Sequence, residues 1–301
     1  MESFKTQDAA SYDHVAASFA RFTDIVTTSL ADTAVRMADL RPSNRILDVG
    51  TGSGIVGLAA ASSVKGGLVA GLDLSDGLLA EARNKRDTAG MRRRFHLTRG
   101  DAESLPYRDA AFDRVLSLFA LLHFPHPAVA LKEMVRVLKP GGRLVIGLGS
   151  RPPWTSLNGW RNRVGRAAGI LRLWSGRLLV APAHLDAIVA RHIPPSGLEE
   201  TELAQLGGHR AAQALSLFRQ AGLADIDTAW EGRHLVVDDA NDFWELQRTF
   251  SSMSRKRLQS ATASQLASVR EEFDRDCARV LSNGGQLAYH YAAYFLAGRR
   301  P

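Results

Sequence analysis

Residues 46–54, with the sequence ILDVGTGSG, decide the fold, because a short apolar run leads directly into a glycine-rich turn. Glycine at positions 50, 52 and 54 allows the backbone to bend sharply and to approach a ligand closely at the start of the next helix. A literal GxGxxG also occurs at Gly52, Gly54 and Gly57, which alone is weak evidence for a dinucleotide site. The stretch predicts a strand–turn–helix unit with a ligand at the helix N-terminus.

Outward from this turn, short apolar runs alternate with helical segments as far as residue 150. The runs are RILDVG, GLVAGLDLS, FHLTRGD, FDRVLSLF and RLVIGLGS. Strand and helix repeated at this spacing predict a parallel sheet with helices on both faces. Residues 1–44 are predicted to be helical, 151–212 to be a helical insertion with no convincing strand, and 45–150 with 213–301 to form one interrupted α/β core.

Three carboxylates follow the first three runs, at Asp48, Asp73 and Asp101. A carboxylate beside the glycine turn repels a pyrophosphate but suits an ammonium-bearing ligand, and Asp73 is placed to accept both ribose hydroxyl hydrogens. Asp101 is placed to accept from an adenine amine, with the N–H of Ala102 toward the ring. Together they indicate an adenosine without phosphates, whereas each acid taken alone is equally well explained as a turn cap or helix cap.

The segments LDVGTGSG, GLDLS, GDAESLPYRDAAFDRVLSLFALLHF and VLKPGGRLVI, in this order, resemble the class I S-adenosylmethionine-dependent methyltransferases. The nearest branch is that of ubiquinone and menaquinone biosynthesis and related small-molecule enzymes. The resemblance covers 45–148 well, 213–230 and the last strand loosely, and the insertion hardly at all. It implies a Rossmann-like α/β sheet of seven strands whose last strand is antiparallel, with 1–44 as an N-terminal lid and 151–212 as a helical substrate cap.

The resemblance also implies the contacts of the cofactor, S-adenosylmethionine. They are Tyr12 as a lid tyrosine, Asp48, Gly50, Gly52 and Gly54 at the methionine moiety, Asp73 at the ribose, Leu74 beside the adenine, Asp101 and Ala102 at the adenine, and Ser117 and Leu118 along the pocket wall.

A general base must lie within hydrogen-bond reach of the proton it removes. His123 follows the fourth run, where the methyl group would project, and is the first candidate; the alternative is a packed or capping histidine. His126 is a weaker candidate because prolines flank it. No group of histidines, cysteines or acids near the turn has the spacing of metal ligands, so no metal is expected.

The composition is that of a globular chain: 301 residues, 45% hydrophobic, 23% charged, net charge +7. Nine arginines and four acids lie between 151 and 220, a difference of +5, so most of the excess lies in or next to the insertion. Its amphipathic segment 154–178 is interpreted as a packed cap, with two alternatives: arginines that meet an anionic substrate, or weak contact with a membrane surface. No nucleic-acid module is recognisable. The oligomeric state stays open, a homodimer included.

The single cysteine, Cys277, cannot form an internal disulfide, and the first residues lack a signal-peptide pattern, which favours the cytoplasm. The function expected is methyl transfer to O, C or N of a small, lipophilic or polycyclic metabolite, in biosynthesis. The alternatives are a non-methylating member of the same fold, either a cyclase or a cofactor-dependent binding protein, and then an NAD(P)-dependent oxidoreductase.

Overall fold

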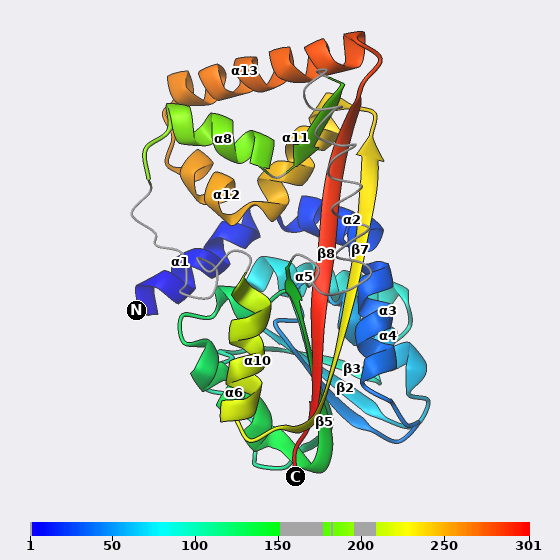
Figure 1. Ribbon diagram of the computed structural model, residues 1–301. Helices are drawn as coiled ribbons and strands as arrows, with labels where there is room; N and C mark the ends of the chain where they lie inside the picture. Colours follow the sequence, from blue (N-terminus) through cyan, green and yellow to red (C-terminus); the bar gives the residue numbers. More distant parts are fainter. Residues whose placement is uncertain (1, 151–176, 182, 196–208) are drawn as a thin grey trace. The chain divides into compact units, whose positions relative to one another are not determined.

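The computed structural model describes residues 2–150, 177–181, 183–195 and 209–301 (Figure 1). The strands are β1 (Arg45–Val49), β2 (Leu68–Asp73), β3 (Phe95–Arg99), β4 (Phe112–Leu118), β5 (Leu138–Gly149), β6 (Leu178–Ala181), β7 (Ala224–Val237) and β8 (Gln286–Arg299). The helices are α1 (Glu2–Asp13), α2 (Ala16–Val26), α3 (Thr28–Met37), α4 (Ile55–Ser63), α5 (Asp76–Thr88), η1 (Leu121–His123), α6 (Pro127–Val137), α8 (Ala183–His192), α10 (Arg210–Gln220), α11 (Ala240–Phe250), α12 (Ser252–Gln259) and α13 (Ala263–Ser282).

The chain divides into two compact units. The sheet unit comprises residues 1–151, 200–231 and 293–301, and the helical unit comprises 152–199 and 232–292. This differs from the predicted boundaries, because 232–292 were assigned to the α/β core and instead pack with part of the insertion. The insertion also contains a strand, β6, that its sequence did not indicate. The four residues of β6 are too few for an apolar alternation to stand out.

In the sheet unit, the strand order is β3-β2-β1-β4-β5-β8, and β7 also pairs with β8. The pairs along the order from β3 to β5 are parallel, and β8 runs antiparallel to β5, with Leu144 opposite Gly298. Seven of the described strands have residues in this unit, which confirms the predicted seven-stranded Rossmann-like α/β fold with an antiparallel last strand.

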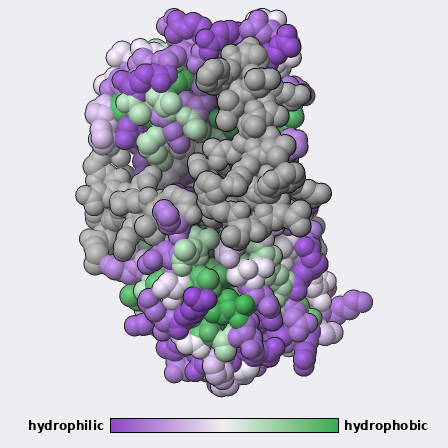
Figure 2. Space-filling model, viewed as in Figure 1, coloured by the Kyte–Doolittle hydropathy of each residue, from purple (hydrophilic) through white to green (hydrophobic). Residues whose placement is uncertain are grey.

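Helices lie on both faces of this sheet, as the alternating pattern requires. In Figure 1, α3 and α4 lie on one face, and α6 and α10 on the other. The second face buries the main apolar core, including Leu131 and Met134 of α6 and Phe218 of α10. Figure 2 shows apolar residues gathered around α10 within a mostly hydrophilic surface. The predicted N-terminal helices are confirmed as α1, α2 and α3, and all three belong to the sheet unit.

The helical unit is built from α8, α11, α12 and α13, with β6 pairing the first half of β8. Its core buries Leu185, Ile188, Phe243, Phe273 and Cys277. Helix α13 begins with a capping box, in which Thr262 and Gln265 satisfy each other's backbone N–H groups. None of the described helices in either unit is long and apolar enough to cross a membrane.

Candidate functional site

The glycine turn between β1 and α4 has the backbone geometry that its sequence predicted. Gly50, Gly52 and Gly54 have φ values of +70°, +54° and +86°, which L-residues with a side chain rarely adopt. The N–H groups of residues 50 and 51 both donate to the carbonyl of Leu72, at 2.8 and 3.0 Å, so the turn is tied to the end of β2. Gly57 serves packing, since a Cβ there would lie 2.2 Å from the ring of Phe95.

Asp48 lies at the carboxyl end of β1 and is 1% exposed. Its Oδ2 accepts a hydrogen bond of 2.6 Å from the hydroxyl of Thr51, while its Oδ1 has no hydrogen-bond partner among the described residues. Burial raises the pKa of Asp48 to about 7, and the bond from Thr51 opposes that rise. A buried carboxylate with one vacant acceptor and a raised pKa favours the arrival of a cationic ligand group.

Asp73 ends β2 and faces the same turn. Its Oδ2 accepts from the N–H of Gly52 at 2.8 Å, and its Oδ1 accepts from the N–H of Ser75 at 3.0 Å. Burial raises the pKa of Asp73, and these backbone N–H groups oppose the rise. Each carboxylate oxygen keeps a second lone pair, so Asp73 is still able to accept from a diol. Leu74 follows it and is half-buried.

Asp101 follows β3 and is held by a residue that the sequence did not single out. Lys5 of α1 contacts Oδ2 of Asp101 at 2.6 Å and Oε2 of Glu103 at 2.6 Å. The other oxygen of Asp101 accepts from the N–H of Glu103 at 2.8 Å, and Ala102 between them is buried. The loop after β3 is therefore bound to the N-terminal helix α1 through the ion pair of Asp101 with Lys5.

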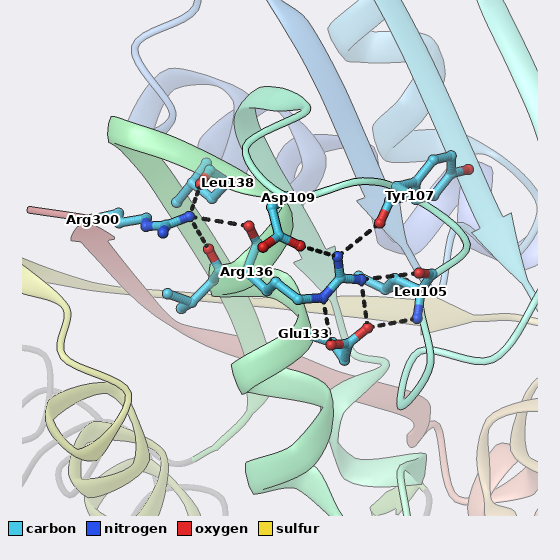
Figure 3. A network of polar contacts seen from close by, with 8 residues as sticks. Leu105, Tyr107, Asp109, Glu133, Arg136, Leu138 and Arg300 are labelled. Atoms are coloured by element: carbon cyan, nitrogen blue, oxygen red, sulfur yellow. Dashed lines mark hydrogen bonds and ion pairs between the residues drawn. The ribbon is translucent and has the colours of Figure 1, made fainter.

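A second set of polar contacts fixes the far end of this loop (Figure 3). The guanidinium of Arg136, on α6, donates to the carbonyls of Leu105 and Tyr107 at 3.1 and 2.8 Å. It also pairs with Asp109 and Glu133, each at 2.7 Å, and Glu133 in turn accepts from the N–H of Leu105. Because the single guanidinium group of Arg136 binds two loop carbonyls and two carboxylates, the loop that begins at Asp101 is anchored to α6.

The strands β1, β2, β3 and β4 end at the same side of the sheet, which is called the carboxyl edge below. The end of β4 forms its next part. Ser117 is buried, and its hydroxyl has no hydrogen-bond partner among the residues the structure describes. Leu118 is half-buried, and Phe119 after it has a φ of +61°, held by an N–H bond of 2.7 Å to the carbonyl of Gly147. A bulky residue in the left-handed region costs about 1–3 kcal/mol and is concentrated at functional sites.

His123, at the end of η1, is brought to this edge, and α1 supplies its neighbours. Its Nδ1 lies 3.4 Å from Oδ2 of Asp8, and its Nε2 lies 3.2 Å from the hydroxyl oxygen of Tyr12. The next acid on α1, Asp13, accepts from the hydroxyl of Ser75 at 2.6 Å and from the N–H of Gly77 at 2.8 Å. Helix α1 thus contacts the segments that follow β2, β3 and β4.

Sequence reasoning found Tyr12 but missed Lys5, Asp8 and Asp13. Their signal is the spacing of Lys5, Asp8 and Tyr12 at three and four residues, which places three polar side chains on one face of a helix. That spacing was outweighed by the apolar pattern that begins at Tyr12. Asp13 has no comparable signal, because its partners are the hydroxyl and backbone N–H at the start of α5.

His126, the weaker candidate from the sequence, contacts Glu103 at 3.0 Å, and Glu103 in turn pairs with Lys5. Within the helical unit, His184 contacts Asp276 at 3.1 Å. Cys277 is buried, and burial raises the pKa of its thiol to about 12. Within the described part of the chain, no group of three or more histidines, cysteines and acids could hold a metal ion. Most of 154–178 lies outside the described residues.

Comparison with known proteins identifies the family of this chain. A family model described as a methyltransferase domain matches residues 47–146. The chain is 34% identical over 157 residues to the ubiquinone/menaquinone biosynthesis C-methyltransferase UbiE of Ectopseudomonas mendocina, covering 50% of this chain and 61% of that enzyme. It is 31% identical over 212 residues to the 27-O-demethylrifamycin SV methyltransferase of Amycolatopsis mediterranei, covering 67% of this chain and 74% of that enzyme.

Among solved structures, the [4+2]-cyclase SpnF is similar, with a TM-score of 0.53 and 23% identity over 91% of this chain and 81% of that one. This likeness concerns the fold alone.

Proposed function

This chain belongs to the class I S-adenosylmethionine-dependent methyltransferases, and from that membership we propose that it methylates O, C or N of a small, lipophilic or polycyclic metabolite. The observation that carries the proposal is the carboxyl edge of β1, β2 and β3, where Asp48, Asp73 and Asp101 accompany a glycine turn with no basic residue. Because the matched segment spans only 61% of the UbiE relative, the activity and substrate of the whole protein are part of this proposal.

The residues present fit the family's cofactor. The buried, unpartnered Oδ1 of Asp48 is an acceptor for the ammonium of the methionine moiety, and Asp73 has lone pairs left for ribose hydroxyls. At Gly52, a Cβ would lie 3.5 Å from the ring of Phe19 of α2, an ordinary contact, so glycine is favoured there by its φ of +54°. Asp101 and Ala102 would bind the adenine, and Ser117 and Leu118 would line the wall beside it.

The cofactor supplies a methyl group on a positively charged sulfur, and the chain's residues supply the position and the removal of a proton. A nucleophile aligned with the carbon–sulfur bond needs little further assistance, because positioning alone accounts for much of such a rate. Residues 1–44 would close over the cofactor as a lid through the contacts of α1. The insertion 151–212 would serve as the substrate cap.

The relatives' names support the substrate class. One is named for ubiquinone and menaquinone biosynthesis and the other for 27-O-demethylrifamycin SV, and both names refer to small molecules. One enzyme is named a C-methyltransferase, while the other name specifies an O-demethyl compound, so the methylated atom is not narrowed by the family. We propose that the enzyme acts in the cytoplasm and that nucleic acid is not its substrate.

Two measurements test the function and separate it from its alternatives. Isothermal calorimetry should show binding of S-adenosylhomocysteine and no binding of NAD⁺ or NADP⁺, and the reverse result would exclude a methyltransferase. Candidate substrates should then be incubated with cofactor that carries a deuterated methyl group. A product heavier by one labelled methyl group supports methyl transfer, whereas an isomerised product without label would identify a cyclase, an activity recorded on this fold in SpnF.

A further inference from the structure

One lysine of the N-terminal helix α1 is held between two carboxylates of the loop after β3. The ammonium of Lys5 contacts Oδ2 of Asp101 and Oε2 of Glu103, each at 2.6 Å, and the Lys5 side chain is only 19% exposed. Burial lowers the pKa of Lys5, but the hydrogen bonds to the two carboxylates outweigh burial and raise that pKa above its ordinary value. Lys5 is therefore a fixed cation rather than a solvated surface lysine.

Glu103 holds Lys5 from the side away from Asp101. Its side chain is 8% exposed, and its Oε1 accepts from the backbone N–H of His126 at 2.7 Å. Its Oε2, which contacts Lys5, also lies 3.0 Å from Nδ1 of His126. His126 is the N-cap residue of α6, and α6 packs into the apolar core of the sheet unit. The position of the Lys5 ammonium is thus tied to a rigid part of the fold.

Two bonds set the direction of the Asp101 carboxylate. Its Oδ2 contacts Lys5, and its Oδ1 accepts from the N–H of Glu103 at 2.8 Å. The carboxylate cannot rotate without losing one of these contacts. An ionised carboxylate has about four acceptor sites, and this side chain is 35% exposed, so acceptor sites stay accessible to a ligand.

We propose that Lys5 is a positioning residue for recognition of the cofactor's base, because it fixes the Asp101 carboxylate that accepts from the exocyclic amine of adenine. This inference rests on the proposed function, in which Asp101 binds the adenine. Lys5 acts through Asp101 and need not touch the base. Since Lys5 belongs to α1, docking of this helix and recognition of the amine share one carboxylate and reinforce each other.

Helix α1 has a second anchor, which supplies the matched control. Asp13, at the other end of the helix, accepts from the hydroxyl of Ser75 at 2.6 Å and from the N–H of Gly77 at 2.8 Å. Its loss should loosen α1, whereas the pair of Lys5 with Asp101 should survive because Glu103 also holds Lys5. A lysine that only anchored the helix would be equivalent to Asp13. A positioning lysine instead affects the contact with the amine.

The test compares two ligands by isothermal calorimetry on the full chain. One is S-adenosylhomocysteine, and the other is its deaminated analogue, in which hydrogen replaces the exocyclic amine of the base. The analogue lacks the donor for Asp101, so the wild type should bind it about tenfold more weakly. In Lys5→Met this ratio should fall to about threefold or less. In Asp13→Ala the ratio should equal that of the wild type, even where both ligands bind more weakly.

A second measurement uses the wild-type protein alone. Linkage is reciprocal: if Lys5 strengthens binding of the amine, the bound amine strengthens the docking of α1. Saturating S-adenosylhomocysteine should therefore slow amide hydrogen exchange in α1 more than the saturating analogue does. This comparison decides the matter if Lys5→Met binds neither ligand.

The outcomes separate this inference from the proposed function. An unchanged ratio in Lys5→Met, an equal fall of the ratio in Asp13→Ala, or equal protection of α1 by both ligands would overturn the positioning role and leave methyl transfer in place. Equal affinities of the wild type for the two ligands would overturn the contact of Asp101 with the amine, and the role of Lys5 with it. If the wild type does not bind S-adenosylhomocysteine, the proposed function itself fails.

Discussion

The glycine turn at the carboxyl edge of the sheet and the contacts of Asp186 in the helical unit are stabilised in different ways. At the turn, Asp73 accepts from the N–H groups of Gly52 and Ser75, and the turn donates to the carbonyl of Leu72, so the backbone supplies one side of each bond. In the helical unit, Asp186 of α8 accepts from the hydroxyls of Ser251 and Ser254, so both sides of each bond are side chains. The turn therefore depends on backbone geometry, and the position of Asp186 on particular partners that are distant in sequence.

The largest expected effect tests the backbone geometry of the edge. Gly50→Ala places a methyl group 2.2 Å from Cβ of Ala120, at a φ of +70°. Strain of the left-handed conformation and overpacking add to a loss of about 4 kcal/mol in the free energy of unfolding. Equilibrium urea unfolding measures this change.

The matched control is Gly90→Ala, which has a similar φ of +66° and no atom within 4 Å of the added Cβ. It should cost only about 1 kcal/mol, from conformation alone. Equal losses at the two positions would mean that Ala120 yields and that the turn is less closely packed than described.

The same contrast explains what could be predicted from the sequence. The glycine turn, the alternation of strands and helices as far as residue 150 and the acids at strand ends follow from neighbouring residues, because they are set by local spacing and a local backbone path. The contacts of Lys5 and Asp8 join α1 to segments after β3 and β4, and no local pattern specifies them. For the same reason, the grouping of α11, α12 and α13 with α8 could not be predicted, since it depends on contacts such as those of Asp186.

The next effect concerns ligand affinity at the edge. Asp73→Ala removes charged acceptors proposed for the ribose hydroxyls and should weaken binding of S-adenosylhomocysteine by about 1.5–3 kcal/mol, measured by calorimetry. Asp76→Ala removes an acid of α5 close in sequence, whose carboxylate lies 3.5 Å from Arg99 and whose side chain is 63% exposed. That variant should bind as the wild type does, and unchanged affinity in both would contradict the ribose assignment.

A smaller effect is expected in the helical unit. Asp186→Ala removes the acceptor shared by Ser251 and Ser254 and should lower stability by about 2 kcal/mol, while the affinity for S-adenosylhomocysteine stays unchanged. In this variant, the rate of amide hydrogen exchange should increase first in α8 and α12.

Glu271→Ala provides the comparison, since its carboxylate is 77% exposed and lies 3.8 Å from Arg275 on the same helix. Its loss should change stability by less than about 0.5 kcal/mol. A fall in ligand affinity in Asp186→Ala would show that the two regions are energetically coupled, contrary to their separate construction.

The smallest expected effect is a pH dependence that only the edge should show. With a pKa of about 7, Asp48 is half protonated near neutral pH, and the ligand's ammonium binds the ionised form. Below the pKa, binding must first release a proton, so affinity for S-adenosylhomocysteine should rise about tenfold from pH 6 to pH 8. Burial also raises the pKa of Asp73, so its ionisation should likewise increase the ligand affinity as the pH rises.

Calorimetry in buffers of different ionisation enthalpy measures both the affinity and the proton released. Asp48→Asn should bind more weakly at pH 8 and should lose most of the pH dependence, because its side chain has no proton to release. Weakening of wild-type binding as pH rises would contradict an ammonium contact at Asp48. Burial opposes the negative charge of Asp48, so in the folded protein without ligand its carboxyl group is partly protonated at neutral pH. When the ligand binds, its positively charged ammonium stabilises the carboxylate, and Asp48 becomes fully ionised.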